Sequence, residues 1–280
     1  MEYLDKIYTK TKKAVANASF CLRSDVAGLI KDAYGHEKNE NAKQALSWII
    51  KNANIAKKKK IAICQDTGMP IVFIEAGSDV SVNTKLINTI TTAILDGYLS
   101  HCLRQSIVDP LTRKQLYSQG VIPHIEFSPR KKGLRITLFP KGFGSENKSR
   151  LKMFDPTTNI RIIEEFIVDS VKKAGPEGCP PFIVGVGVGG TSDKALLLAK
   201  KSLLGNLKKK NPEKIISTLE KRLLHKINSL EIGPMGLGGK HTCLAVKIKT
   251  APTHIAGLPI GVNISCHVLR SFRFKINKDE

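Results

Sequence analysis

The segment Phe182–Val188 leaves the chain few folds to choose from, because it is an unbroken stretch of apolar side chains and glycine. Such a stretch is typical of a strand buried on both faces, in a sheet that helices cover on either side. Gly189 and Gly190 follow it, and a helical pattern begins at Thr191 and continues to Leu204. The sequence therefore predicts a sheet whose buried strand runs into a helix through a glycine turn.

The glycines of this segment allow more than one functional interpretation. Gly185–Gly190 satisfies the pattern G-x-G-x-x-G between a strand and a helix, which is the dinucleotide-binding fingerprint. However, Lys208–Lys214 contains no strand ending in an acidic residue that could hold a ribose. A tight turn that permits close packing is one alternative. The other is an anion held by the backbone N–H groups at the start of the helix.

The rest of the chain predicts an α+β fold, with a helical N-terminal part packed on a mixed-sheet α/β remainder. Helices are expected at Leu4–Ala16, Arg23–Ala33, Asn41–Ala56 (ended by Lys57–Lys60), Thr84–Leu99, Ile160–Ala174 and Glu213–Ser229. Further strands are expected at Ile61–Cys64, Pro70–Ala76, Ile122–Ser128, Leu134–Phe139, Thr242–Lys249 and Leu258–Cys266. We expect residues 1–280 to form a single domain, helical over about 1–60 and strand-rich over about 61–270. Arg130–Gly133 predicts a hairpin turn, and the basic tail from His267 is expected at the surface.

The net charge of +21 raises the possibility of a nucleic-acid-binding protein. The basic runs are short and scattered, and no helix-turn-helix, zinc-finger or RNP pattern accompanies them, so a solvated lysine-rich surface is the better interpretation. A positive field would also steer a dicarboxylate dianion or an acidic partner subunit. No apolar run approaches the roughly 18 residues of a membrane span, and no secretory signal is visible, so we expect a cytoplasmic protein without membrane contact.

Six cysteines are spread along the chain, and they form no C-x-x-C pair. A chain of this length without a secretory segment does not call for a disulfide framework. Three of the cysteines stand beside turns or at strand ends, where reactive sites are usually built: Cys64, Cys179 and Cys266. Cys21 and Cys102 lie in or beside expected helices, and Cys243 lies in an expected strand. From composition alone, an apolar role and a ligand role remain equally good for the first three.

The segments around these cysteines carry a resemblance to a known family. Ile63–Pro70 (ICQDTGMP) resembles the I-C-Q-D-T-G signature of class I fumarases and L-tartrate dehydratases, and Leu103–Pro110 (LRQSIVDP) is similar to a second segment of that family. Further matches follow in order at Gly144–Asn147 (GSEN), Gly187–Thr191, Lys194–Lys200, Ile232–Gly239, Thr253–His254 and Cys266. They extend over nearly the whole chain. Phe143 departs from the pattern, because it interrupts the glycine run that precedes the G-S-E-N loop.

The resemblance implies a [4Fe-4S] cluster held by Cys64, Cys179 and Cys266, with the fourth iron open. Such an iron would act as a Lewis acid in the reversible hydration of fumarate to (S)-malate. The matching positions for the substrate site are Gln65, Asp66, Arg104 and His254, of which Arg104 suits a bidentate contact with a carboxylate.

The same resemblance implies a partner. Single-chain relatives continue into a C-terminal domain that supplies the catalytic base, so the base is expected on a separate β subunit, in an α2β2 assembly. Asp66 is the local candidate for the base. L(+)-tartrate dehydration is the alternative reaction, and a basic nucleic-acid-binding protein is the distant alternative from another class.

Overall fold

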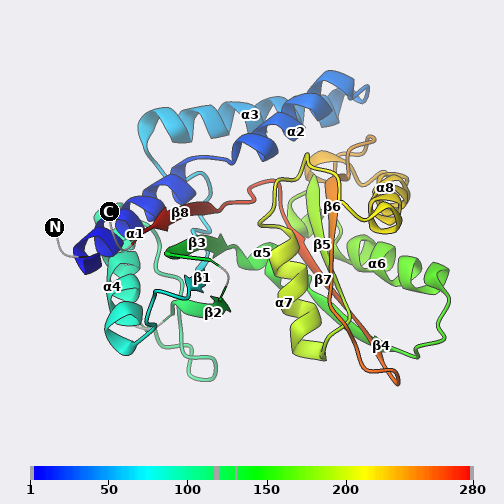
Figure 1. The fold of residues 1–280 in the computed structure, drawn as a ribbon. Coiled ribbons are helices and arrows are strands. Elements are labelled where there is room, and N and C mark those ends of the chain that lie inside the picture. The colour runs from blue at the N-terminus through cyan, green and yellow to red at the C-terminus, as the bar shows by residue number, and fades with distance from the viewer. Residues whose placement is uncertain (1–2, 117–119, 130, 278–280) are drawn as a thin grey trace. The chain divides into compact units, whose positions relative to one another are not determined.

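The computed structural model describes residues 3–116, 120–129 and 131–277 (Figure 1). It separates into two compact units, each assembled from more than one stretch of the chain. Unit 1 comprises Met1–Arg23, Asn52–Phe143 and Arg270–Glu280, and unit 2 comprises Ser24–Lys51 and Gly144–Leu269. The single-domain organisation expected from the sequence stays a prediction.

Unit 1 is a four-stranded sheet with two helices against one face (Figure 1). The sheet has the order β2-β1-β3-β8, in which β1 pairs in parallel with β2 and antiparallel with β3, and β3 pairs antiparallel with β8. Its elements are α1 (Tyr3–Phe20), β1 (Met69–Gly77), α4 (Thr84–Ser100), β2 (Ile122–Ser128), β3 (Leu134–Lys141) and β8 (Phe272–Ile276).

The core of unit 1 follows from the alternation along its strands. Val72 and Ile74 of β1 point to the same face as Ile136 of β3, and all three are fully buried against Ile90 of α4 and Val15 of α1. Side chains at i and i+2 share one face of a strand, so Glu75 and Arg135 point to the opposite face.

Unit 2 is built around a second mixed sheet, of order β4-β7-β5-β6. The strand β5 pairs in parallel with β6 and antiparallel with β7, and β4 pairs antiparallel with β7. Its helices and strands are α2 (Ser24–His36), α3 (Glu40–Lys59, continuing into unit 1), α5 (Phe143–Glu146), β4 (Arg150–Phe154), α6 (Ile160–Ala174), β5 (Phe182–Val188), α7 (Ser192–Ser202), α8 (Lys214–Asn228), β6 (Cys243–Thr250) and β7 (Leu258–Ser265). Two short 3-10 helices are η1 (Pro176–Gly178) and η2 (Pro234–Gly236).

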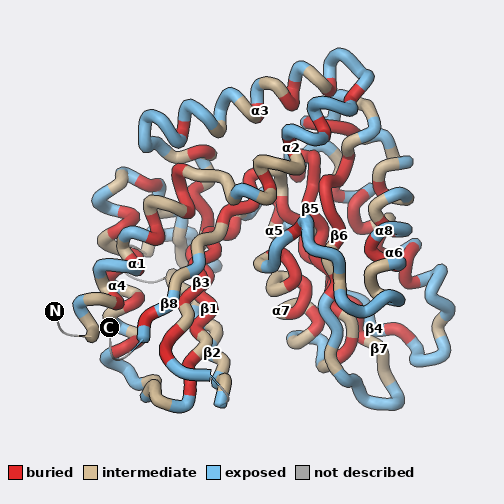
Figure 2. Tube along the Cα trace, turned by 45° about the horizontal axis from the view of Figure 1, so that its top comes forward, coloured by how far each residue is buried: buried red, intermediate tan, exposed pale blue. Residues whose placement is uncertain are grey.

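Helices cover both faces of this second sheet, as the apolar run predicted. Val184 and Val186 pack with α6 and α8, whereas Gly185 and Gly187 face α7. Figure 1 shows α7 on one side of the sheet and α6 with α8 on the other, and Figure 2 shows β5 buried along its length. A Cβ at Gly187 would lie 2.0 Å from the carbonyl oxygen of Ala195, so the helix backbone rests directly on the strand.

One buried charge links two helices of unit 2. The carboxylate of Glu164 in α6, whose side chain is 1% exposed, accepts hydrogen bonds from Arg222 Nε at 2.6 Å and Lys226 Nζ at 2.7 Å in α8. Burial alone would raise the pKa of Glu164, but these two cations bring it below its ordinary value.

Several local expectations were wrong. Residues 134–141 and 122–128 do not form a hairpin, because β1 lies between them. Arg130 of the expected turn lies outside the described residues. Ile61–Cys64 is not a strand, and α3 extends three residues beyond Ala56 before it ends inside the lysine run, at Lys59. Both β4 and β8 were missed, and the tail is not a surface segment, because Leu269, Arg270 and Ile276 are buried.

The broad fold class is confirmed: the chain combines helices with two mixed sheets. In the parts of the chain that the structure describes, none of the helices combines the length and apolar character needed to cross a membrane.

Candidate active site

The turn that follows Cys64 is held in place by the side chain of Asp66. One carboxylate oxygen accepts the N–H of Gly68 at 2.9 Å, and the other accepts the N–H of Phe143 at 2.7 Å. Gly68 has φ +82°, and a Cβ there would lie 2.7 Å from the carbonyl carbon of Pro140. The turn therefore requires glycine, and Asp66 joins it to the segment after β3. Phe143 makes this contact through its backbone, so its bulky side chain does not prevent it.

Arg104 is tied to the same turn. The hydroxyl of Thr67 donates to the carbonyl oxygen of Arg104 at 2.6 Å, and the hydroxyl of Tyr98 lies 3.1 and 3.0 Å from the carbonyl oxygens of Thr67 and Gly68. Burial raises the pKa of Tyr98, so its hydroxyl keeps its proton and remains a donor. The side chains of Gln65 and Arg104 are exposed. Unit 1 thus brings three of the predicted residues, Gln65, Asp66 and Arg104, to one place.

Sequence analysis missed Arg270, which belongs to this group. It is 3% exposed, and its Nη2 donates to the carbonyl oxygen of Asp66 at 2.8 Å. Its Nε and Nη1 are buried without a hydrogen-bond partner among the described residues. The backbone of Gly142 approaches this group closely, since a Cβ there would lie 3.1 Å from Asp66 Oδ2 and 3.6 Å from Arg270 Nη2. The only sequence signal was an arginine soon after Cys266, in a tail taken for surface.

Unit 2 places the segments of Cys179 and Cys266 side by side. Cys179 follows η1 with φ +58° and is exposed, while Cys266 follows β7 and is half-buried. The carbonyl oxygen of Cys179 accepts the backbone N–H of His267 at 3.4 Å and its ring Nδ1 at 3.0 Å. Since a carbonyl oxygen only accepts, Nδ1 carries the proton. Burial lowers the pKa of His267, which favours the neutral ring.

The other cysteines differ in their surroundings. Cys64 is half-buried in unit 1, whereas Cys243 is 2% exposed, and burial raises the pKa of its thiol to about 12. Cys243 is therefore an apolar core residue. Within the described ranges, no group of three His, Cys, Asp or Glu side chains is close enough to hold a metal ion. The three candidate ligands are divided between the units.

The glycine turn after β5 does not leave its N–H groups open to an anion. Gly189 and Gly190 donate to the carbonyl oxygens of Pro259 at 3.0 Å and Pro252 at 3.1 Å. At the start of α7, hydrogen bonds from the Thr191 side chain and from backbone N–H groups hold the pKa of Asp193 below its usual range. The two glycine N–H groups are thus satisfied within the chain, and the close contacts of Gly189 and Gly190 favour the close-packing interpretation.

His254 lies beside this turn, away from the cysteines of unit 2. The Thr253 hydroxyl contacts the carbonyl oxygen of Gly190 at 3.1 Å, and His254 Nδ1 accepts the N–H of Ala256 at 3.1 Å. Nε2 therefore carries the ring proton when the ring is neutral. His254 precedes the first residue of β7 and Cys266 follows the last, and this strand of 8 residues spans roughly 26 Å.

The G-S-E-N loop is anchored by its glutamate. Glu146 forms an ion pair with Lys200 of α7, and its other oxygen accepts Asn263 Nδ2 at 2.8 Å. Asn263 is 1% exposed and also donates to Ser149 Oγ at 2.8 Å. Lys200 belongs to the helix that the resemblance also matches, so the structure connects two of the matched motifs.

Another matched motif, Ile232–Gly239, leads into a second anchor. The side chain of Glu37, 1% exposed, accepts the N–H of Lys240 at 3.1 Å and pairs with His241 Nδ1 at 2.7 Å. A Cβ at Gly233 would lie 1.4 Å from the carbonyl oxygen of Gly238, so the loop folds back on itself through bare backbone.

Comparison with known proteins agrees with the motifs. Residues 8–275 match the family model described as fumarate hydratase (fumerase). A Methanocaldococcus jannaschii protein, provisionally named L(+)-tartrate dehydratase subunit alpha, is 41% identical over 89% of this chain and 90% of its own length. The L(+)-tartrate dehydratase subunit alpha of Escherichia coli K12 is 25% identical over 91% of this chain and 86% of its own.

A third relative is longer. A Geobacillus stearothermophilus protein, provisionally named class I fumarate hydratase, is 28% identical over 95% of this chain but only 54% of its own length. Because one family model covers nearly all of the described residues and the first of these relatives matches throughout, the chain belongs to the fumarate hydratase family of hydro-lyases.

Proposed function

We propose that this chain is the α subunit of a cytoplasmic two-subunit iron–sulfur hydro-lyase that interconverts fumarate and (S)-malate. The observation that carries the proposal is the turn after Cys64, where Asp66, Arg104 and Arg270 meet through the contacts described above. A C4 dicarboxylate needs cations beside a polar backbone, and this turn offers both. Two of the relatives are named alpha subunits, which supports a β partner and an α2β2 assembly.

The residues present fit an iron–sulfur cluster. Cys179 is exposed and Cys64 and Cys266 are half-buried, all three stand outside regular strands and helices, and the last two lie on adjacent segments. Thiolates are the ligands that such clusters use. Cys243 is buried with a raised pKa and does not qualify. When bound, a cluster with three thiolate ligands supplies a Lewis-acidic iron with an open position for substrate oxygens.

The chain's own residues then have separate tasks. The exposed guanidinium of Arg104 binds one substrate carboxylate, and Gln65 donates or accepts beside it. Asp66 remains a candidate base, although both of its oxygens already accept backbone N–H groups, which makes a positioning task the better assignment. The principal base is expected on the β subunit. Arg270 is a positioning residue, because its buried guanidinium donates a hydrogen bond to the carbonyl oxygen of Asp66.

We assign His254 to the active site of a second α chain. His254 precedes one end of β7 and Cys266 follows the other, and this strand spans roughly 26 Å, several times the length of a C4 dicarboxylate, so one substrate cannot touch both ends of the strand. An α2β2 assembly contains a second copy of the chain, and its His254 can serve the first copy's site.

Tartrate dehydration is the alternative, favoured by the names of two relatives. Both substrates are C4 dicarboxylates with a hydroxyl beside a carboxylate in one direction of the reaction, so the same residues serve either one. The substrate must be decided by assay.

The test is anaerobic iron and sulfide reconstitution of this chain together with its β subunit, followed by fumarate hydration and tartrate dehydration assays. Activity that needs both chains and disappears with Cys266→Ser supports the proposal, and tartrate turnover alone selects the alternative. Co-assembly of Cys266→Ser chains with His254→Gln chains should restore roughly a quarter of the activity if histidines act across copies. Absence of restoration would remove the second-copy assignment while leaving the hydro-lyase proposal intact.

A further inference from the structure

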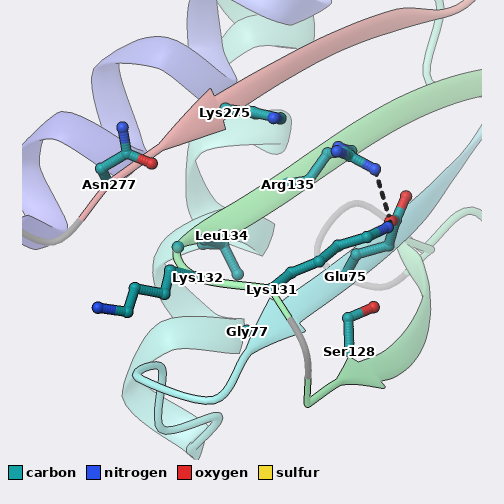
Figure 3. A pocket seen from close by; sticks show the side chains of 10 residues that line it. Glu75, Gly77, Ser128, Lys131, Lys132, Leu134, Arg135, Lys275 and Asn277 are labelled. Atoms are coloured by element: carbon teal, nitrogen blue, oxygen red, sulfur yellow. Dashed lines mark hydrogen bonds and ion pairs between the residues drawn. The ribbon is translucent and has the colours of Figure 1, made fainter.

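A pocket lies in unit 1 at the end of the sheet where β1 finishes and β3 begins (Figure 3). Its volume is about 220 Å³. It is lined by Glu75, Gly77, Ser128, Lys131, Lys132, Gly133, Leu134, Arg135, Lys275 and Asn277. Four of these residues are cations and one is an acid. The pocket is separate from the turn after Cys64, because the two lie at opposite ends of β1, a strand of 9 residues that spans roughly 30 Å.

The strand register places like charges next to each other at this pocket. Glu75 of β1 pairs with Arg135 of β3, and Arg135 pairs with Lys275 of β8, so the three side chains form a row across one face of the sheet. Cross-strand neighbours of like charge destabilise a sheet. Glu126 of β2 extends the row beyond Glu75. The acidic and basic halves of the row are therefore segregated, and the basic half lines the pocket.

One carboxylate is shared among the cations. Glu75 contacts Arg135 Nη1 at 2.8 Å and Lys131 Nζ at 3.6 Å. Figure 3 shows Lys131 and Arg135 both reaching toward Glu75, Lys275 projecting from β8 at the same end of the sheet, and Lys132 turned away. Among the residues that line the pocket four are cations and one is a carboxylate, so positive charge exceeds negative charge there.

The loop Lys131–Gly133 is held by hydrogen bonds within the chain. The carbonyl oxygen of Lys131 accepts the N–H of Ser78 at 3.0 Å, and the N–H of Gly133 donates to Asp79 Oδ1 at 2.8 Å. A Cβ at Gly77 would lie 2.6 Å from the carbonyl oxygen of Lys131, so the loop presses directly against the strand end. A preorganised loop loses little entropy when a ligand orders its side chain.

We propose that this pocket binds a small oxyanion with two or more negative charges, of the phosphate or pyrophosphate class. Paired residues on neighbouring strands have Cβ atoms roughly 5 Å apart, so Arg135 and Lys275 reach one compact group together. The volume of 220 Å³ is below the roughly 300 Å³ at which pockets for drug-sized ligands begin. The proposal is independent of the hydro-lyase reaction.

The test is calorimetric titration of the full chain with inorganic pyrophosphate, and then phosphate, at low ionic strength. Lys275→Gln and Lys131→Gln each remove one charge at the exposed rim, and Lys85→Gln removes the same charge from an exposed position on α4 of the same unit. We expect saturable one-site binding that weakens about tenfold in each pocket variant and stays within about twofold in the control, with unchanged unfolding midpoints. Equal weakening in all three variants would mean a general attraction to a chain of net charge +21 and would overturn the proposal.

Two further outcomes also decide it. Absence of saturable binding at millimolar pyrophosphate would refute the site. Equal affinity for malonate or fumarate would refute the phosphate class, because it would show a site for carboxylates instead. None of these readouts depends on the cluster or on the β subunit, so failure of the hydro-lyase proposal leaves this test unaffected.

Discussion

The ion pair between Glu146 and Lys200 gives a stability prediction with an internal control. The two side chains are 19% and 18% exposed, and they join the G-S-E-N loop to α7. A second pair in the same unit, Lys173 with Asp169, is 63% and 41% exposed and spaced i,i+4 on α6. The second pair is an exposed reference of the same charge type, although Asp169 also pairs with Arg150 at 2.6 Å.

The expected magnitude follows from these exposures. Exposed pairs contribute about 0.2–1 kcal/mol, and helical i,i+4 pairs about 0.3–0.5 kcal/mol. Removing one partner of a fully buried pair costs about 3–5 kcal/mol. The pair formed by Glu146 and Lys200, about four-fifths buried, should fall between these limits, with a coupling free energy of about 2 kcal/mol.

The assay is a double-mutant cycle by urea denaturation, with Glu146→Gln, Lys200→Met and the double variant. The double variant should be more stable, by about 2 kcal/mol, than the two single losses predict when added. The cycle with Asp169→Asn and Lys173→Met should give at most about 0.5 kcal/mol and should shrink further in high salt. A coupling for the Glu146 pair no larger than that of the control would refute the reasoning.

Three further predictions concern single residues. Because the pKa of Glu164 is lowered in the fold, the stability that it contributes is present above its unfolded pKa and is lost as pH falls through its folded pKa. Glu164→Gln should therefore flatten the loss of stability below about pH 4.5 in denaturation experiments across pH. The exposed control Glu165→Gln should leave that loss unchanged. Gly187→Ala should lower the unfolding free energy, measured by urea titration, by about 3 kcal/mol or more, because the added methyl would meet the α7 backbone. In the control Gly205→Ala the new Cβ lies 3.8 Å from its nearest neighbour, so the unfolding free energy should change by less than about 1 kcal/mol. Arg270→Met removes one hydrogen bond and two unpartnered buried nitrogens, so the unfolding free energy should change by at most about 1–2 kcal/mol. The kcat of the reconstituted enzyme should nevertheless fall about 100-fold. A loss of activity that merely follows a loss of folding would contradict a positioning role.

The fold was predictable where pattern and burial agree locally. Phe182–Val188 was recognised as a doubly covered strand because its apolar run has no polar side, and the structure confirms it. The strand β8 was missed because it is short, although Arg273 and Lys275 alternate with apolar residues as in a strand with one open face. The false hairpin had a different cause. Short connections favour pairing of consecutive strands, but β1, distant in sequence, pairs with both β2 and β3.

The site was predictable only where residue type and motif coincide. Cys64, Asp66 and Arg104 come from contiguous motifs, and contacts within unit 1 bring their segments together. Arg270 had no such signal, because its contact with Asp66 joins residues that are far apart in the chain. His254 shows the converse limit, because a motif identifies a residue type but not where the fold places it, which here is the loop before β7.

The division of unit 1 among three stretches of chain has a consequence for synthesis on the ribosome. All of unit 2 is translated before Arg270, whereas unit 1 still lacks β8 at that moment. β8 covers the edge of β3 and adds Ile276 to the core, so the first-made part of the protein is completed last. At ordinary translation speed the edge of β3 stays unpaired for on the order of ten seconds. During that interval it is a template for pairing with other nascent chains, and slower translation of unit 2 would lengthen the exposure.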